Sequence, residues 1–189
     1  MNIMQSKMLL ALTLIISLMS CNAQTLPINT ALSEIPAGAH LKDTNNEFTL
    51  FVGTYKANFN GNEITLFITK QEDKLEKSAH KNYYMDALIV KYIVKNSLGA
   101  TLQDTQNNNI YNIEFYSIDI PSPNTIGFLY SGTNCSVGWG EINLKKISST
   151  QISWEYRPND IVTTASKCPP NLDTKIYLPE TKDLIFTKQ

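Results

Sequence analysis

The sequence predicts an all-β domain, either an antiparallel up-and-down barrel or a strongly curved sandwich, with about eight to ten strands. From Phe48 onward, apolar residues recur at every second position, which is typical of half-buried antiparallel strands. Turn residues such as Asn60-Gly61 interrupt this alternation, and no long stretch has helical periodicity. Closure into a barrel would also remove free sheet edges, which otherwise pair with other chains.

The first predicted element is a β-hairpin. Residues 51–59 alternate in polarity and place Tyr55 on the inward face. Asn60-Gly61 follows at once, and this dipeptide suits the positive φ angles of a type I′ turn. Residues 63–70 should therefore return as the partner strand.

The rest of the domain continues the same pattern with one break. Residues 71–81 are polar and charged, and predict a loop or a short helix. Further strands are predicted, in order, at residues 85–95, 100–104, 110–120, 125–131, 137–147, 151–157, 175–178 and 183–187.

The N-terminus predicts export from the cytoplasm. Residues 1–20 contain one cation, Lys7, then an apolar run over 8–19, then small residues, which is the pattern of a signal peptide. The apolar run is too short for a membrane-spanning helix, which needs about 20 residues.

The end of this signal, Leu18-Met19-Ser20-Cys21, resembles the lipobox of bacterial lipoproteins. That resemblance implies cleavage before Cys21 and acylation of its thiol, and two acyl chains anchor a protein stably to a membrane. An ordinary secretory signal with a chance cysteine is the alternative. The predicted organisation is a signal peptide at 1–20, a lipidated cysteine with a tether and first loop at 21–47, and one β domain at 48–189.

The predicted location is the bacterial cell envelope, at the periplasm-facing leaflet of the outer membrane. Residues 22–25 lack an acidic cluster that would resemble the surface-export signals of some bacterial lipoproteins. The nearly balanced charge, net −1, gives no basic patch and predicts no nucleic-acid partner.

Two further cysteines, Cys135 and Cys168, predict a disulfide in an oxidising compartment. The bridge would close a loop of about 34 residues and stabilise the fold by roughly 3 to 4 kcal/mol in the chain-entropy model. Two separate reduced thiols are the alternative.

Several segments resemble a family of small uncharacterised Bacteroidota lipoproteins, a domain of unknown function. They are residues 41–47, 51–56, 84–89, 132–140, 177–179 and 184–188. The family implies no activity. Gly53-Thr54-Tyr55 also resembles the Gly-x-Trp of the first lipocalin strand, which supports a lipocalin-like barrel by analogy only.

The sequence carries no catalytic motif that we recognise. The histidines are His40 and His80, and neither belongs to a zinc-binding spacing, so no metal or cofactor is predicted. Asp43, Asn45 and Glu47 have the spacing that begins a calcium loop, but a turn role suits them better because later calcium ligands are missing.

Carboxylates on the strands keep one enzymatic alternative open. Glu114, Glu141 and Glu155 lie in predicted strands, where a barrel could bring two of them together for hydrolysis. Residues of this kind usually form the solvated face of a strand. An enzyme is therefore the alternative prediction, as a small hydrolase.

Aromatic residues on the inward faces are the remaining candidates. They either fill the core or line a cavity for a small apolar ligand. The candidate lining residues are Tyr55, Tyr92, Tyr111, Phe115, Tyr130, Trp154 and Tyr156. The preferred functional prediction is a noncatalytic, membrane-anchored binding or structural module, with a small apolar ligand or an envelope protein as partner.

Overall fold

A computed structural model describes residues 24–106 and 113–189 of the chain. Within these ranges the chain forms eleven strands and three short 3₁₀ helices. Eight strands form the barrel: β3 (Gly53–Phe59), β4 (Asn62–Lys77), β5 (Asn82–Lys95), β7 (Phe115–Ser122), β8 (Thr125–Tyr130), β9 (Gly140–Lys146), β10 (Gln151–Tyr156) and β11 (Thr181–Lys188).

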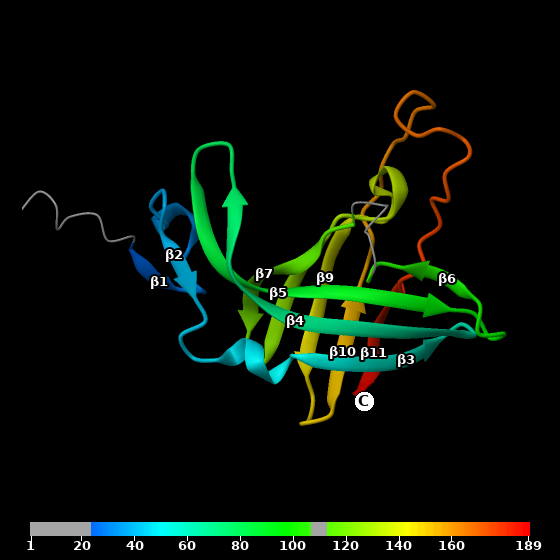
Figure 1. Cartoon of the computed structure of the whole chain (residues 1–189), viewed down its shortest axis with the longest axis horizontal. Coiled ribbons are helices and arrows are strands. Elements are labelled where there is room, and N and C mark those ends of the chain that lie inside the picture. The colour runs from blue at the N-terminus through cyan, green and yellow to red at the C-terminus, as the bar shows by residue number, and fades with distance from the viewer. Residues whose placement is uncertain (1–23, 107–112) are drawn as a thin grey trace, which may run out of the picture.

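The barrel is an antiparallel meander in which each strand pairs with the next barrel strand along the chain. It closes where β11 pairs with β3, through Lys188 opposite Tyr55. The seam between β5 and β7 has one pairing, Ile89 opposite Tyr116. Strands β8 to β11 cross β3 to β5 at a steep angle (Figure 1). The prediction of an antiparallel up-and-down barrel is confirmed.

The predicted first hairpin is also confirmed. Strands β3 and β4 pair from Gly53 opposite Ile68 to Phe59 opposite Asn62. The turn residues Asn60 and Gly61 have φ angles of 49° and 78°, which lie in the left-handed region that this turn requires. Local sequence therefore fixes this hairpin and its register.

The predicted loop or short helix at residues 71–81 is wrong for 71–77, because β4 continues to Lys77 and pairs with β5 to Asn82, and only residues 78–81 form a loop. This extension, which we call the arm, projects beyond the barrel (Figure 1). A bulge sets Glu72 and Asp73 opposite Asp86, and Asp73 has φ of 50°. The arm lies outside the barrel core and is therefore mostly polar. Its sequence thus lacks the apolar alternation by which the other strands were predicted.

The segment predicted as tether and first loop contains structure of its own. Strands β1 (Thr25–Pro27) and β2 (His40–Lys42) are parallel, and β2 adds to the edge of β5. Between them lies η1 (Leu32–Glu34). A small second core joins this segment to the arm, and its buried members are Ile35, Ala39, Leu41 and Met85.

Two 3₁₀ helices and one strand lie in the connections: η2 (Glu47–Leu50), β6 (Thr101–Asp104) and η3 (Asn134–Ser136). The strand predicted at 175–178 is wrong, because these residues form no ladder and belong to the long connection from β10 to β11. Ile176 and Leu178 nevertheless pack on the core, which explains their apolar alternation.

Candidate functional site

The barrel interior is filled by aromatic side chains. Six of the seven aromatic residues predicted to line a ligand cavity lie there, each at most 2% exposed. They are Tyr55, Tyr92, Phe115, Tyr130, Trp154 and Tyr156. The seventh, Tyr111, lies outside the described residues. None of the six lines the hollows described below.

These aromatic residues contact one another in edge-to-face geometry. The ring of Phe115 lies 5.7 Å from that of Tyr130 and 6.2 Å from that of Trp154, measured between centroids. Such contacts add stabilisation beyond simple area burial. The interior of the described structure is therefore a packed core at this level of the barrel.

The polar atoms of these rings are paired. The indole N–H of Trp154 donates to the carbonyl of Pro179 at 2.8 Å, and the hydroxyl of Tyr92 donates to Gln103 at 2.8 Å. The Tyr92 and Tyr130 hydroxyls lie 3.1 Å apart. Burial raises the pKa of Tyr130 to about 12. The phenol is therefore neutral at physiological pH and serves packing and hydrogen bonding.

Open apolar surface lies outside the barrel, beside β7. Three hollows meet at Ile120 and together form what we call the β7 groove. Their volumes are about 520, 420 and 70 Å³. The first lies between η2 and the turn from β7 to β8, and the second lies between β7 and the N-terminal segment. Leu50, Leu32 and Ile118 beside these hollows are 51%, 58% and 41% exposed.

The groove exists because β5 and β7 separate. After Tyr116 pairs with Ile89, the hydroxyl of Ser117 accepts the Leu88 N–H at 2.9 Å in place of a ladder bond. The register of β7 against β8 then shifts between Ser117 and Asp119. Strand β5 continues into the arm instead, so the last residues of β7 face the N-terminal segment across the groove.

The charged residues lining the groove, among those the structure describes, are Asp43, Glu47 and Asp119. Glu47 and Asp119 take part in no ion pair within the described ranges. Burial, with a smaller effect of Glu141, raises the pKa of Asp119. The groove is thus apolar and bears uncompensated negative charge.

Asp43 belongs to a turn. Its carboxylate accepts the N–H of Glu47 at 2.8 Å and that of Phe48 at 3.2 Å, at the start of η2. Asp and Asn side chains commonly satisfy backbone donors in this way.

Within 24–106 and 113–189, no three Asp, Glu, His or Cys residues are grouped to hold a metal.

An ion-pair cluster around the buried carboxylates of Asp43 and Asp86, which we call the brace, holds the N-terminal segment against the arm. Oδ1 of Asp86 accepts a hydrogen bond from the Lys42 ammonium at 3.1 Å, and Oδ2 accepts one from the backbone N–H of Asp43 at 3.2 Å. The Nζ of Lys70 lies 3.3 Å from Oδ2 of Asp43 and 3.6 Å from Oδ2 of Asp86. The brace therefore links the N-terminal segment, β4 and β5 beside the groove.

The charges and hydrogen bonds of the brace lower the pKa values of two carboxyl groups, those of Asp86 and Asp73. Burial alone would raise the pKa of Asp86, but the N–H groups of Asp43 and Asp73 and the Lys42 ammonium outweigh it, so the pKa is lowered. A hydrogen bond from Lys42, and a second from His40, lower the pKa of Asp73. Both carboxylates are therefore charged at neutral pH.

The family follows from the whole chain. The sequence profile described as "Family of unknown function (DUF6705)" matches residues 4–189. The chain belongs to this family. The expected resemblance to an uncharacterised family is thereby confirmed, whereas Bacteroidota origin and lipoprotein status stay predictions. A search of curated proteins and a search of solved structures found no match to this DUF6705 chain.

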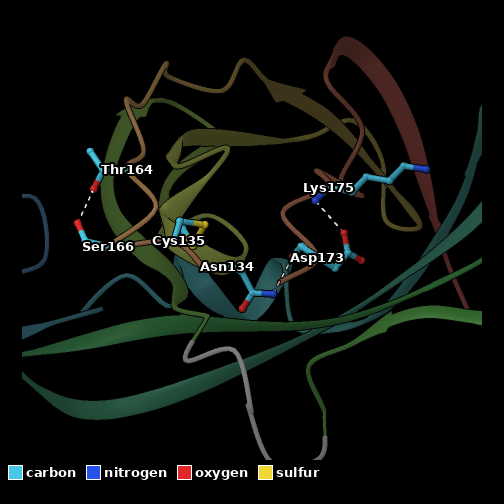
Figure 2. The surroundings of a disulfide bond; sticks show 7 residues. Asn134, Cys135, Thr164, Ser166, Asp173 and Lys175 are labelled. Carbon is cyan, nitrogen blue, oxygen red and sulfur yellow. Dashed lines mark hydrogen bonds between the residues drawn. A yellow bond between two sulfur atoms is a disulfide. The ribbon is translucent and has the colours of Figure 1, made fainter. Parts of the chain in front are cut away.

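The predicted disulfide of the DUF6705 chain is confirmed. Cys135 and Cys168 are bonded, with their Cα atoms 5.6 Å apart. Figure 2 shows Cys135 in η3 beside the long connection between β10 and β11. The disulfide holds this connection, which has no strand of its own, against the barrel.

Hydrogen bonds support the disulfide on both sides. The Asn134 side chain donates to the Asp173 carbonyl at 2.7 Å, and the Asp173 carboxylate accepts the Lys175 N–H at 2.9 Å (Figure 2). The Lys175 N–H, and then the Tyr177 hydroxyl, lower the pKa of Asp173. This disulfide end and the groove lie at opposite ends of β8, which begins at Thr125 beside the groove and ends at Tyr130 near η3.

The three strand carboxylates of the hydrolase alternative lie on the outside of the barrel. Glu114, Glu141 and Glu155 are all exposed. Glu155 pairs with Lys182 at 3.8 Å and lines a shallow hollow of about 290 Å³ that neither of the others reaches. The structure does not bring these three residues together.

Neither histidine lines the groove. His40 bonds Asp73 at 2.7 Å through Nδ1 and stacks on Tyr84, and His80 is exposed at the tip of the arm. The disulfide leaves Cys135 without the free thiol that a nucleophile requires.

Cys21 and the signal at 1–20 lie outside the described residues, and no helix in the described ranges is long and apolar enough to cross a membrane.

Proposed function

We propose that this protein is a noncatalytic binding module of a bacterial cell envelope, held by lipid on Cys21 at the periplasm-facing leaflet of the outer membrane. It binds its partner in the β7 groove, outside the barrel. The observation that carries this proposal is the contrast between a filled interior and an open apolar groove. Exposed apolar surface in a concave site is a usual mark of ligand or protein binding.

The size and lining of the groove support binding. Its two larger hollows, about 520 and 420 Å³, fall in the range of small-molecule and peptide sites. The brace and the barrel wall hold its two sides in place, which favours a preformed site and reduces the entropy lost on binding. The groove contains no histidine, cysteine or lysine among its lining residues in the described structure, so its chemistry suits recognition.

The anchor is supported by the export pattern of residues 1–20 and the lipobox at 18–21. Metabolic labelling of the full chain with an alkyne fatty acid in a bacterial host tests it. We expect label on the wild-type chain and none on Cys21→Ala, and an inhibitor of lipoprotein signal peptidase should cause the precursor to accumulate. Equal labelling of both chains, or normal maturation with the inhibitor, contradicts the anchor.

The binding role is tested by native mass spectrometry of the full chain released from its own host membranes. The groove variant Leu50→Glu places a charge in the apolar hollow, and Val162→Glu is the matched control on the disulfide loop, where Val162 is 93% exposed. We expect a retained molecule on the wild-type and control chains and its loss from Leu50→Glu. Equal retention by all three chains contradicts binding in the groove.

A further inference from the structure

We infer that the β7 groove binds an extended segment of another envelope protein that carries aliphatic side chains and at least one lysine or arginine. The inference rests on the proposed binding function and specifies the chemistry of the partner. Three independent features of the groove carry it: its charge, its apolar hollows and the open edge of β7.

The charge of the groove selects a cation. Asp43, Glu47 and Asp119 are its charged lining residues in the described structure, and no lysine or arginine lines it. The brace already engages Asp43 through Lys70. The Glu47 carboxylate accepts one side-chain hydrogen bond among the described residues, from the Asn45 amide at 3.4 Å. The Asp119 carboxylate lies beside Gly127 of β8 and has no ion pair in the described structure, so both charges remain for a partner. A complementary cation improves both specificity and association rate.

The apolar hollows select aliphatic side chains. Leu50 and Phe51 form one wall of the first hollow, and Ile28, Leu32 and Ile118 line the second. The two hollows share Ile120, so they lie in sequence along the end of β7. A partner that fills both must be elongated, with apolar groups at separate positions.

The edge of β7 selects an extended backbone. Beyond Tyr116, no described strand pairs with β7 on the side that faces the groove. An exposed edge offers backbone N–H and C=O groups to an added strand. Pro121 has no N–H, so this pairing is confined to residues 118–120 and the side chains must supply the remaining affinity.

The test uses a random heptapeptide library displayed on phage against the full chain in phosphatidylcholine nanodiscs, with empty nanodiscs as background. Binding of the enriched peptide is then measured by fluorescence anisotropy. The groove variant carries Glu47→Gln and Asp119→Asn. Its matched control carries Glu155→Gln and Asp160→Asn, which remove the same charge from exposed sites outside the groove.

We expect enriched peptides to combine aliphatic residues with lysine or arginine. Their affinity should fall about tenfold or more for the groove variant, equivalent to about 1.4 kcal/mol, and remain unchanged for the control. Enrichment of neutral or acidic peptides, or equal binding to both variants, overturns the inferred charge preference.

The failure of this inference is distinguishable from failure of the proposed function. If no peptide is enriched but native mass spectrometry shows a small molecule lost from Leu50→Glu, the peptide inference is overturned and the binding function stands. If no peptide is enriched and native mass spectrometry finds no molecule that is lost from Leu50→Glu, both are overturned.

Discussion

The barrel interior and the β7 groove are both apolar, yet they differ in access to water. Trp154 and Phe128 in the interior are 0% exposed, whereas Leu32 and Leu50 beside the groove are 58% and 51% exposed. Buried side chains contribute to folding, because their apolar area leaves water when the chain folds. The groove side chains still expose apolar area to water, and burial of that area against a partner would contribute to the free energy of binding.

The barrel is therefore occupied by its own side chains at the level of the aromatic cluster. A ligand there would have to displace rings whose polar atoms are already paired, such as the Trp154 indole on Pro179. The predicted lining role of these residues remains a prediction, and the structure places their rings in contact with one another.

The largest expected effect comes from opening the interior. Trp154→Ala removes a large buried ring and leaves the Pro179 carbonyl without its donor, so the free energy of unfolding should fall by about 3–5 kcal/mol. The milder Trp154→Phe should fold and lose less. Urea unfolding followed by circular dichroism measures both.

The matched substitution in the groove is Leu50→Ala, which should change the unfolding free energy by no more than about 0.5 kcal/mol. Similar losses for Trp154→Phe and Leu50→Ala would remove the distinction between the two regions.

The disulfide end gives the next largest effect. Reduction of the Cys135–Cys168 bridge, or replacement of both cysteines with alanine, should lower the unfolding free energy by about 3 kcal/mol in the chain-entropy model. Thermal unfolding with and without reductant measures this loss. Peptide binding at the groove should persist in the folded fraction, because the disulfide lies at the other end of β8. Loss of binding by folded, reduced protein would show that the two ends are coupled.

The brace should have a smaller effect that depends on pH. Asp86→Asn removes a charged acceptor from Lys42 and two backbone N–H groups, so we expect a loss of about 1.5–3 kcal/mol at pH 7. The pKa of Asp86 in the folded state lies below its ordinary value of 3.8. Its stabilisation is therefore fully present above that value and is lost as the pH falls through the folded-state pKa.

Urea unfolding of the wild-type and Asp86→Asn chains from pH 7 down to acid measures this dependence. The difference between the two chains should shrink below about pH 4. The exposed Asp160→Asn serves as control. A difference that grows on acidification contradicts the assigned role of Asp86.

The smallest expected stability effect is at the groove carboxylates. Glu47→Gln with Asp119→Asn should change the unfolding free energy by no more than about 0.5 kcal/mol, because neither side chain has an ion pair in the described structure. Chemical denaturation of the double variant checks this value. A large loss would mean that these carboxylates support the fold, and would weaken their assignment to binding.

Much of the barrel was predictable because alternation and turn chemistry act over short distances. Asn60-Gly61 determined one hairpin, and a closed barrel was one of the two predicted architectures because closure removes free sheet edges. The disulfide was predictable from the pairing of two cysteines in an exported chain.

The arm and the N-terminal strands could not be predicted in the same way. Residues 71–77 contain one apolar side chain, Leu75, because the arm leaves the barrel, so no apolar alternation marks them as strand. Strands β1 and β2 have three residues each, which is too short for a periodic signal. They form because β5 offers them an edge, and that edge exists only in the folded barrel.

The groove was not predictable because its residues are distant in the chain. Leu32, Leu50 and Ile120 come together only when β5 parts from β7 and the N-terminal segment packs on the arm. One local indication of the groove is present in the sequence. Ile118 and Ile120 alternate at the end of a predicted strand, and Pro121 and Pro123 follow directly.

Methyl NMR of the full chain in nanodiscs, with isoleucine methyl groups labelled, tests whether the peptide selected at the groove binds outside the barrel. Ile118 and Ile120 report on the groove, and Ile142 and Ile152, each 0% exposed, report on the interior. We expect binding to shift the signals of Ile118 and Ile120 and to leave those of Ile142 and Ile152 in place. Shifts confined to Ile142 and Ile152 would place the ligand inside the barrel and contradict binding in the groove.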